Sequence, residues 1–242
     1  MQRRLIVGTM VVAGLAWSLS ASQVVTGSTW GSYQTGNGGE FTVKAVGLDL
    51  SDYSSKASGK SAGEIGNVDT FQTFCLEATS PPEYIEYRTE YNVVVNTKAI
   101  YGGVGPDGDV LSKGTGWLYS QFATGTLASY AFEGTDAQRK ADAGLLQNAI
   151  WWLEDEGQSY NPANKFMVAV AQHFGDGDAV LGQGLAKADG AWLYNVYALN
   201  MTKANGTRAQ DQVYYNVPDG GLTVAMLGVG LAGLGLIARR RN

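Results

Sequence analysis

The chain of 242 residues contains one cysteine, Cys75, and one histidine, His173. A single cysteine excludes a disulfide within the chain, and one cysteine with one histidine cannot supply a zinc site of the Cys/His type. Proline is also scarce, at five residues, whereas glycine is abundant, at 33. We expect neither a metal ion nor an organic cofactor.

Positive charge is in short supply as well. The chain has 17 lysines and arginines against 22 aspartates and glutamates, and a net charge of −5. Several of its arginines lie within a few residues of either end, so the middle of the chain is more acidic than the whole. An acidic surface repels the phosphate backbone, so we expect no nucleic-acid partner.

The N-terminal residues have the order of a secretory signal peptide. Arg3 and Arg4 precede an apolar run over 5–19, and the small residues of 20–22 follow it. The run is shorter than the ~20 residues that a membrane-spanning helix needs. We therefore predict a signal peptide at 1–22, cleaved after Ser22. An uncleaved N-terminal anchor is the alternative.

The C-terminal residues 217–242 have three parts. The motif Val217, Pro218, Asp219, Gly220, Gly221 precedes an apolar stretch over 222–238, and Arg239, Arg240 and Arg241 follow. At ~1.5 Å per residue this stretch spans roughly 26 Å as a helix, which is close to the thickness of the hydrocarbon core. The positive-inside rule keeps the arginines in the cytoplasm, so the rest of the chain is expected outside the cytoplasmic membrane.

This three-part tail resembles the PEP-CTERM class of sorting signals, and most closely its Val-Pro-Asp-Ser-Gly variant, with Gly220 in place of the serine. The resemblance implies recognition by an exosortase, a membrane protease of certain Gram-negative bacteria that make extracellular polymer. It implies export to the cell surface or extracellular matrix and removal or replacement of the tail. A plain C-terminal membrane anchor is the alternative.

Residues 23–216 are long enough for one domain with a sizeable core. The pattern of apolar residues predicts strands first, then helices, then strands again. This order is typical of an α+β domain in which a helical insertion interrupts an antiparallel sheet. The expected strands are 41–45, 70–77, 84–95, 192–199 and 212–217. The expected helices surround 117–122, run from the capping box at Thr135 and Gln138 to about Glu156, and begin at Pro162.

Cys75 lies in the segment Phe74-Cys75-Leu76-Glu77. Side chains alternate between the faces of a strand, so Phe74 and Leu76 share one face while Cys75 and Glu77 share the other. The thiol would then have a carboxylate beside it, and that carboxylate could accept the thiol proton or hold a neighbouring group by a hydrogen bond. The thiolate is the reactive form of cysteine.

Gln147 follows Cys75 by 72 residues and lies in the longest expected helix. It shares a face with Ala143, Leu146 and Ile150, at helical spacing. Burial of a glutamine on an apolar face is costly unless its polar atoms are hydrogen-bonded. Trp151 is one turn further along, where its ring could cover the glutamine and exclude water.

These two motifs together resemble the thioester domain of bacterial surface proteins, which has the pattern aromatic-Cys-apolar-acid on a strand and apolar-Gln-x-x-apolar-Trp on a helix. The resemblance implies a β-sandwich-like sheet with inserted helices. It implies a thioester between Cys75 and Gln147, surrounded by Phe74, Glu77, Ile150 and Trp151. It also implies covalent capture of an amine, typically of a lysine, on a surface protein or extracellular polymer. Each domain would form one bond, so the chain is not expected to be an enzyme.

Cys75, His173 and two acidic segments also have other interpretations. Cys75 could be an inert buried thiol, in a non-covalent structural component of the extracellular matrix, or could form an intermolecular disulfide. The sequences at 107–109 and 176–178 could offer oxygen ligands to calcium, but they are more typical of turns. His173 could partner Cys75 in a hydrolase, but no third residue that would orient it is evident.

Overall fold

The computed structural model describes residues 22–26, 33–35, 38–58, 68–78, 85–86, 88–100 and 107–216. The expected sorting segment 217–242 and the expected signal peptide, apart from Ser22, lie outside these residues. No helix in the described ranges is both long and apolar enough to cross a membrane. The predicted class is confirmed at the level of a mixed α/β fold with antiparallel sheets, and the described residues contain four α-helices.

The main sheet has six strands in the order β10-β9-β6-β1-β4-β5, and every neighbouring pair is antiparallel. Two further sheets have two strands each, β2 with β3 and β7 with β8. The strands are β1 (Ser22–Thr26), β2 (Gln34–Thr35), β3 (Gly38–Gly39), β4 (Phe41–Val46), β5 (Thr70–Thr73), β6 (Glu90–Asn96), β7 (Lys98–Ala99), β8 (Asp109–Val110), β9 (Val196–Thr202) and β10 (Gln212–Tyr215).

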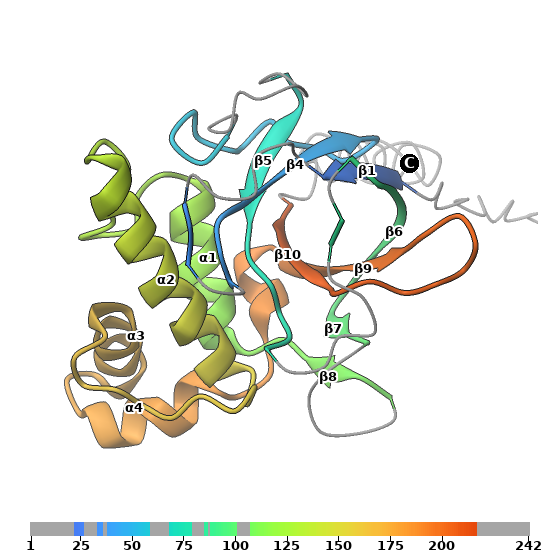
Figure 1. Ribbon diagram of the computed structural model, residues 1–242. Helices are drawn as coiled ribbons and strands as arrows, with labels where there is room; N and C mark the ends of the chain where they lie inside the picture. Colours follow the sequence, from blue (N-terminus) through green and yellow to red (C-terminus); the bar gives the residue numbers. More distant parts are fainter. Residues whose placement is uncertain are drawn as a thin grey trace, which may run out of the picture.

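The two outer strands of the main sheet, β5 and β10, meet just beyond the end of β5 (Figure 1). Cys75 forms an isolated antiparallel bridge with Gln212. The amide of Val213 donates to the carbonyl of Phe74 at 3.1 Å, and the amide of Leu76 donates to the carbonyl of Asp211, also at 3.1 Å. The predicted sandwich-like sheet is thus one sheet that curls until its edges touch, and we call residues 74–76 and 211–213 the seam.

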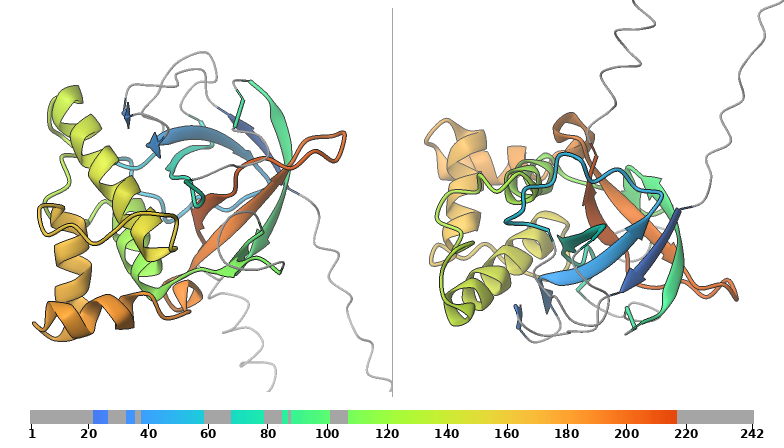
Figure 2. Two further views of the ribbon diagram at one scale, coloured as in Figure 1. Left: turned by 60° about the horizontal axis from the view of Figure 1, so that its bottom comes forward. Right: turned by 90° about the horizontal axis from the view of Figure 1, so that it is seen from above.

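The helices form an insertion between β8 and β9, as the sequence predicts, and pack on one side of the sheet (Figure 2). The insertion consists of α1 (Lys113–Ala123), α2 (Asp136–Leu153), α3 (Lys165–Gly175), α4 (Ala179–Ala186) and the 3₁₀ helix η1 (Ala191–Tyr194). The main core lies between these helices and the sheet, and a second core lies within the curl of the sheet.

The ends of the elements differ in places from the sequence prediction. The capping box at Thr135 and Gln138 does begin α2, but α2 ends at Leu153 rather than near Glu156. Helix α3 does not begin at Pro162, because the side chain of Asn164 accepts hydrogen bonds from the amides of the second and third residues after it and caps the helix there.

Four predicted strands are shorter than expected. The strand expected over 84–95 begins at Glu90, and the strand expected over 212–217 ends at Tyr215. The strand expected over 70–77 ends at Thr73, and Cys75 joins the sheet only through its bridge to Gln212. The strand expected over 192–199 begins at Val196, because the residues before it form η1 and Asn195 then takes the left-handed conformation, with φ of 57°.

The C-terminal end of α2 docks on the N-terminal end of α1 through Glu154, which is buried. Its carboxyl Oε1 accepts from the hydroxyl of Ser112 at 2.8 Å, from the amide of Ser112 at 3.2 Å and from the hydroxyl of Thr115 at 2.5 Å. Burial raises the pKa of Glu154 from its ordinary 4.5 to about 7, and the hydrogen bonds from Thr115 and Ser112 oppose that rise.

We predict that the folded protein loses stability as the pH rises from about 4.5 to about 7, because the unfolded chain ionises Glu154 over this range while the folded chain resists. A pKa displacement of this size corresponds to roughly 3 kcal/mol. Glu154→Gln should flatten this part of the profile, since a carboxamide oxygen can still accept from Ser112 and Thr115. Thermal unfolding of both proteins across this pH range tests the prediction, and parallel profiles would contradict it.

Candidate functional site

Cys75 is fully buried at the seam, with its neighbours on the opposite face. Phe74 and Leu76 belong to the main core, where the ring of Phe74 meets that of Phe122 edge-on, with ring centres 5.0 Å apart. Cys75 instead packs in a small separate cluster with Phe41 of β4 and Trp151 of α2. The alternation expected from the sequence is therefore present although Cys75 lies just outside a regular strand.

Gln147 lies on the buried face of α2, beside Leu146 and Ile150, which belong to the main core. Its side chain reaches the seam and forms a pair of hydrogen bonds with the backbone of Cys75. The amide of Cys75 donates to Gln147 Oε1 at 3.1 Å, and Gln147 Nε2 donates to the carbonyl of Cys75 at 2.8 Å. The two residues singled out from the sequence are thus in direct contact.

A second backbone amide donates to the same oxygen. Gly39, in β3, donates its N–H to Gln147 Oε1 at 3.3 Å. Two N–H groups on one carbonyl oxygen form the arrangement that stabilises a developing oxyanion when a nucleophile attacks the carbonyl carbon. The sequence did not reveal these donors, because a backbone amide has no sequence signature and β3 is only two residues long.

Gly38 allows β3 to approach α2 closely. A Cβ atom at Gly38 would lie 2.4 Å from Gln147 Cγ and 2.8 Å from Trp151 Cη2. Gly39 has a backbone φ of 106°, which residues other than glycine rarely adopt. The adjacent glycines at 38 and 39 were the one available signal for this contact.

The thiol of Cys75 is oriented by two glutamines that were not predicted from the sequence. Cys75 Sγ donates to Gln210 Oε1 at 2.9 Å, and Gln212 Nε2 lies 3.6 Å from the sulfur, to which it donates. Burial raises the pKa of the Cys75 thiol far above its ordinary value; the hydrogen bond from Gln212 opposes this rise, and the nearby Glu77 carboxyl adds to it. The thiol is therefore protonated at neutral pH.

Glu77 is buried near the thiol but forms its hydrogen bonds with the other side of the seam. Its side-chain Oε2 accepts from the backbone amide of Asp211 at 2.9 Å, and its backbone carbonyl accepts from Gln210 Nε2 at 2.6 Å. Burial raises the pKa of Glu77 well above its ordinary value, and the carboxylate of Asp211 adds to the effect. Glu77 thus forms hydrogen bonds with groups beside the thiol, which is the second of the two roles expected from the sequence.

Buried polar atoms without a partner are concentrated at this site. Four such side-chain atoms occur in the described residues, and three of them belong to neighbours of Cys75, namely Glu77 Oε1, Trp151 Nε1 and Gln212 Oε1. Unpaired buried polar atoms are rare in proteins because each costs about 1–3 kcal/mol. Three of the four such atoms in the described residues therefore mark the surroundings of one cysteine.

The other candidate residues lie apart from Cys75 and have structural roles. His173 stacks on Trp117 within the helical insertion, with ring centres 4.3 Å apart. Asp178 caps α4, and Asp176 ends α3 in the left-handed conformation. In the ranges that the structure describes, no group of three or more His, Cys, Asp or Glu side chains is placed to hold a metal ion.

Comparisons with protein-family models, with curated proteins and with solved structures found no match to this chain. The fold and the residues around Cys75 are therefore the grounds for a functional proposal.

We predict that Gly38→Ala lowers the free energy of unfolding by about 1–3 kcal/mol, because the new methyl group overlaps Gln147 and Trp151. Gly184→Ala is the matched control: a Cβ atom at this position of α4 would have nothing within 4 Å, and it should stabilise the chain by about 1 kcal/mol or less. Denaturant titration of the full chain measures both. Equal stability of the Gly38→Ala and original proteins would contradict the close approach of β3 to α2.

Proposed function

We propose that this chain is an exported attachment protein in which Cys75 and Gln147 form an internal thioester, and that the thioester captures an amine on a target surface. The observation that carries the proposal is the placement of the Gln147 carboxamide. It is fixed against Cys75, and its oxygen accepts from the amides of Gly39 and Cys75.

The formation of the bond follows from this arrangement. Sγ of Cys75 attacks Cδ of Gln147, the carbonyl oxygen becomes negative, and the two amide N–H groups stabilise that charge. The tetrahedral intermediate then breaks its bond to Nε2, and the thiol proton leaves with that nitrogen as ammonia. Proximity supplies much of the remaining acceleration, because both groups are held in a buried site.

Capture of the target is the reverse substitution with a different nitrogen. A primary amine attacks the carbonyl carbon of the thioester, the same N–H groups stabilise the oxygen, and the C–S bond breaks. The sulfur takes a proton from the amine nitrogen, which leaves a free Cys75 thiol and an amide that joins Gln147 to the target. The low accessibility of Cys75 and Gln147, 0 % and 1 %, protects the thioester from water until then.

The second candidate is a non-covalent structural component of the extracellular matrix with an inert Cys75. One observation favours it: the carboxamide of Gln147 is hydrogen-bonded through both its oxygen and its nitrogen, as a structural core glutamine would be. The unpaired atoms of Glu77, Trp151 and Gln212 weigh against it, because an inert core has no use for them.

The location of the protein is part of the proposal. The apolar segment after two arginines at the N-terminus and the tail at 217–242 support export and handling by an exosortase. The mature domain would then act at the cell surface or in the extracellular matrix of a Gram-negative bacterium.

We predict that the intact mass of the purified protein falls short of the sequence mass by one ammonia, and that Cys75→Ala and Gln147→Ala each abolish this deficit. Incubation with methylamine should add one methylamine and release one titratable thiol. The measurement is intact-mass spectrometry before and after incubation. A wild-type protein of full mass whose thiol titrates freely on unfolding would leave only the structural candidate.

We predict that the mature protein lacks the tail, and that Pro218→Ala with Asp219→Ala keeps the tail on the chain and the protein in the membrane fraction. The double variant preserves the apolar segment and the three arginines, so it removes recognition without removing the anchor. Cell fractionation and mass spectrometry of the C-terminal peptide check this. An intact tail in both proteins indicates a plain membrane anchor.

A further inference from the structure

We propose that the buried ion pair between Arg139 and Glu40 is the positioning device that sets the Gly39 amide against the carbonyl of Gln147. This inference rests on the proposed thioester, and it assigns two residues that do not touch Cys75 to the control of its formation. The ion pair joins the two segments that carry the donor and the acceptor of this hydrogen bond.

Arg139 and Glu40 interact through both oxygens of the carboxylate. Arg139 Nε donates to Glu40 Oε1 at 2.7 Å, and Arg139 Nη2 donates to Glu40 Oε2 at 2.8 Å. The side chains are 2 % and 0 % exposed. Such a bidentate pair fixes orientation as well as distance.

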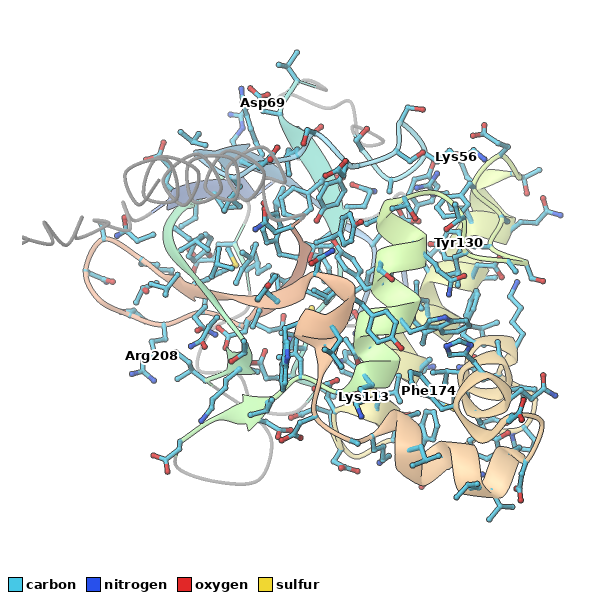
Figure 3. The ribbon with its side chains drawn as sticks, turned by 180° about the vertical axis from the view of Figure 1, so that it is seen from behind. Lys56, Asp69, Lys113, Tyr130, Phe174 and Arg208 are labelled. Atoms are coloured by element: carbon cyan, nitrogen blue, oxygen red, sulfur yellow. The ribbon has the colours of Figure 1, made fainter. Side chains whose placement is uncertain are left out.

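Both members of the pair are held by further groups. Arg139 Nη1 donates to the carbonyl of Phe132 at 3.0 Å, and Arg139 Nη2 donates to the carbonyl of Lys56 at 2.9 Å. Glu40 also accepts from the hydroxyl of Tyr130 at 2.5 Å and from Gln72 Nε2 at 2.9 Å. Lys56 and Tyr130 lie at the same end of the helical insertion, as Figure 3 shows. Four further hydrogen bonds therefore hold the pair in place.

The position of the pair in the chain links it to the site. Glu40 directly follows Gly39, and Arg139 lies on α2 eight residues before Gln147, or roughly 12 Å along the same helix at ~1.5 Å per residue. β3 has two residues and pairs only with β2 in the described sheets, and the main sheet holds this segment from its other end, through β4, which begins at Phe41. Neither sheet connects the segment to α2, and the ion pair supplies that connection by tying the chain next to Gly39 to the helix that carries Gln147.

Stability alone is a weak reason for such a pair. Removal of two charges from water costs several kcal/mol, and well-packed apolar residues of similar volume often serve folding equally well. A bidentate ion pair can nevertheless fix the relative position of two segments, even where it adds little to the free energy of unfolding. Here the pair fixes the position of the Gly39 amide, which would stabilise an oxyanion on Gln147. A small displacement of this amide would weaken that stabilisation.

The test uses the full chain, recovered unfolded from inclusion bodies with Cys75 and Gln147 still free, and refolded in mild detergent. Tryptophan fluorescence follows folding, and intact mass follows the loss of ammonia. The variants are Arg139→Lys, which keeps the charge and loses the fork, and Arg139→Met with Glu40→Leu, which replaces the pair by apolar side chains. We expect both to fold and to lose ammonia at least about tenfold more slowly than the original chain.

Asn164→Ala is the control for a merely structural effect. It removes the cap of α3 and should lower the melting temperature. Asn164 donates to the carbonyl of Leu145 in α2 but touches neither the segment at 38–40 nor Cys75 in the described contacts. It should lose ammonia at the original rate. Failure of the double variant to fold leaves Arg139→Lys as the deciding protein.

The outcomes separate the two proposals. Ammonia loss at the original rate in a folded Arg139→Lys chain overturns the positioning role and leaves the thioester intact. Equal slowing in Asn164→Ala also overturns it, because lowered stability would then explain the effect. Absence of any ammonia loss in the original chain overturns the proposed function itself, and the positioning role falls with it.

Discussion

The constraint on which the site depends is the burial of one carboxamide. Gln147 projects from α2 into a region that excludes water, so its oxygen and its nitrogen both need partners inside the protein. The backbone of Cys75 meets both needs, and Gly39 adds a second donor to the oxygen. This requirement fixes α2 against the seam. Residues 74–76 and 211–213 close the sheet in the same region.

The features of the site that could be predicted from the sequence are those that depend on the periodicity of a single strand or helix. The alternation around Cys75 and the helical spacing of Leu146, Gln147 and Ile150 were predictable, because both follow from the geometry of one element. The capping box that begins α2 was predictable for the same reason. Such features depend on residues a few positions apart, and a single sequence contains that information.

The missed features are contacts between distant parts of the chain. Gly39 and Gln147 are 108 residues apart, and the thiol of Cys75 and its acceptor Gln210 are 135 residues apart. Nothing in the residue types near 38 or 210 identifies the partner, since a backbone amide and a glutamine suit many roles. The early end of β5 has a related cause: the chain leaves regular pairing where the seam begins, and the pattern of side chains continues unchanged through that point.

The seam carries energetic costs that an apolar core would avoid. Burial raises the pKa of Cys75 and of Glu77, and Asp211 beside them has its pKa raised to about 6. An apolar cluster at the same place would avoid these costs and the unpaired polar atoms as well. In the proposed thioester, the carbonyl oxygen of Gln147 would keep the amide donors of Gly39 and Cys75. Loss of the thiol proton and of Gln147 Nε2 would take the present donors away from Gln210 Oε1 and from the carbonyl of Cys75, so closing the bond requires these two acceptors to find new partners.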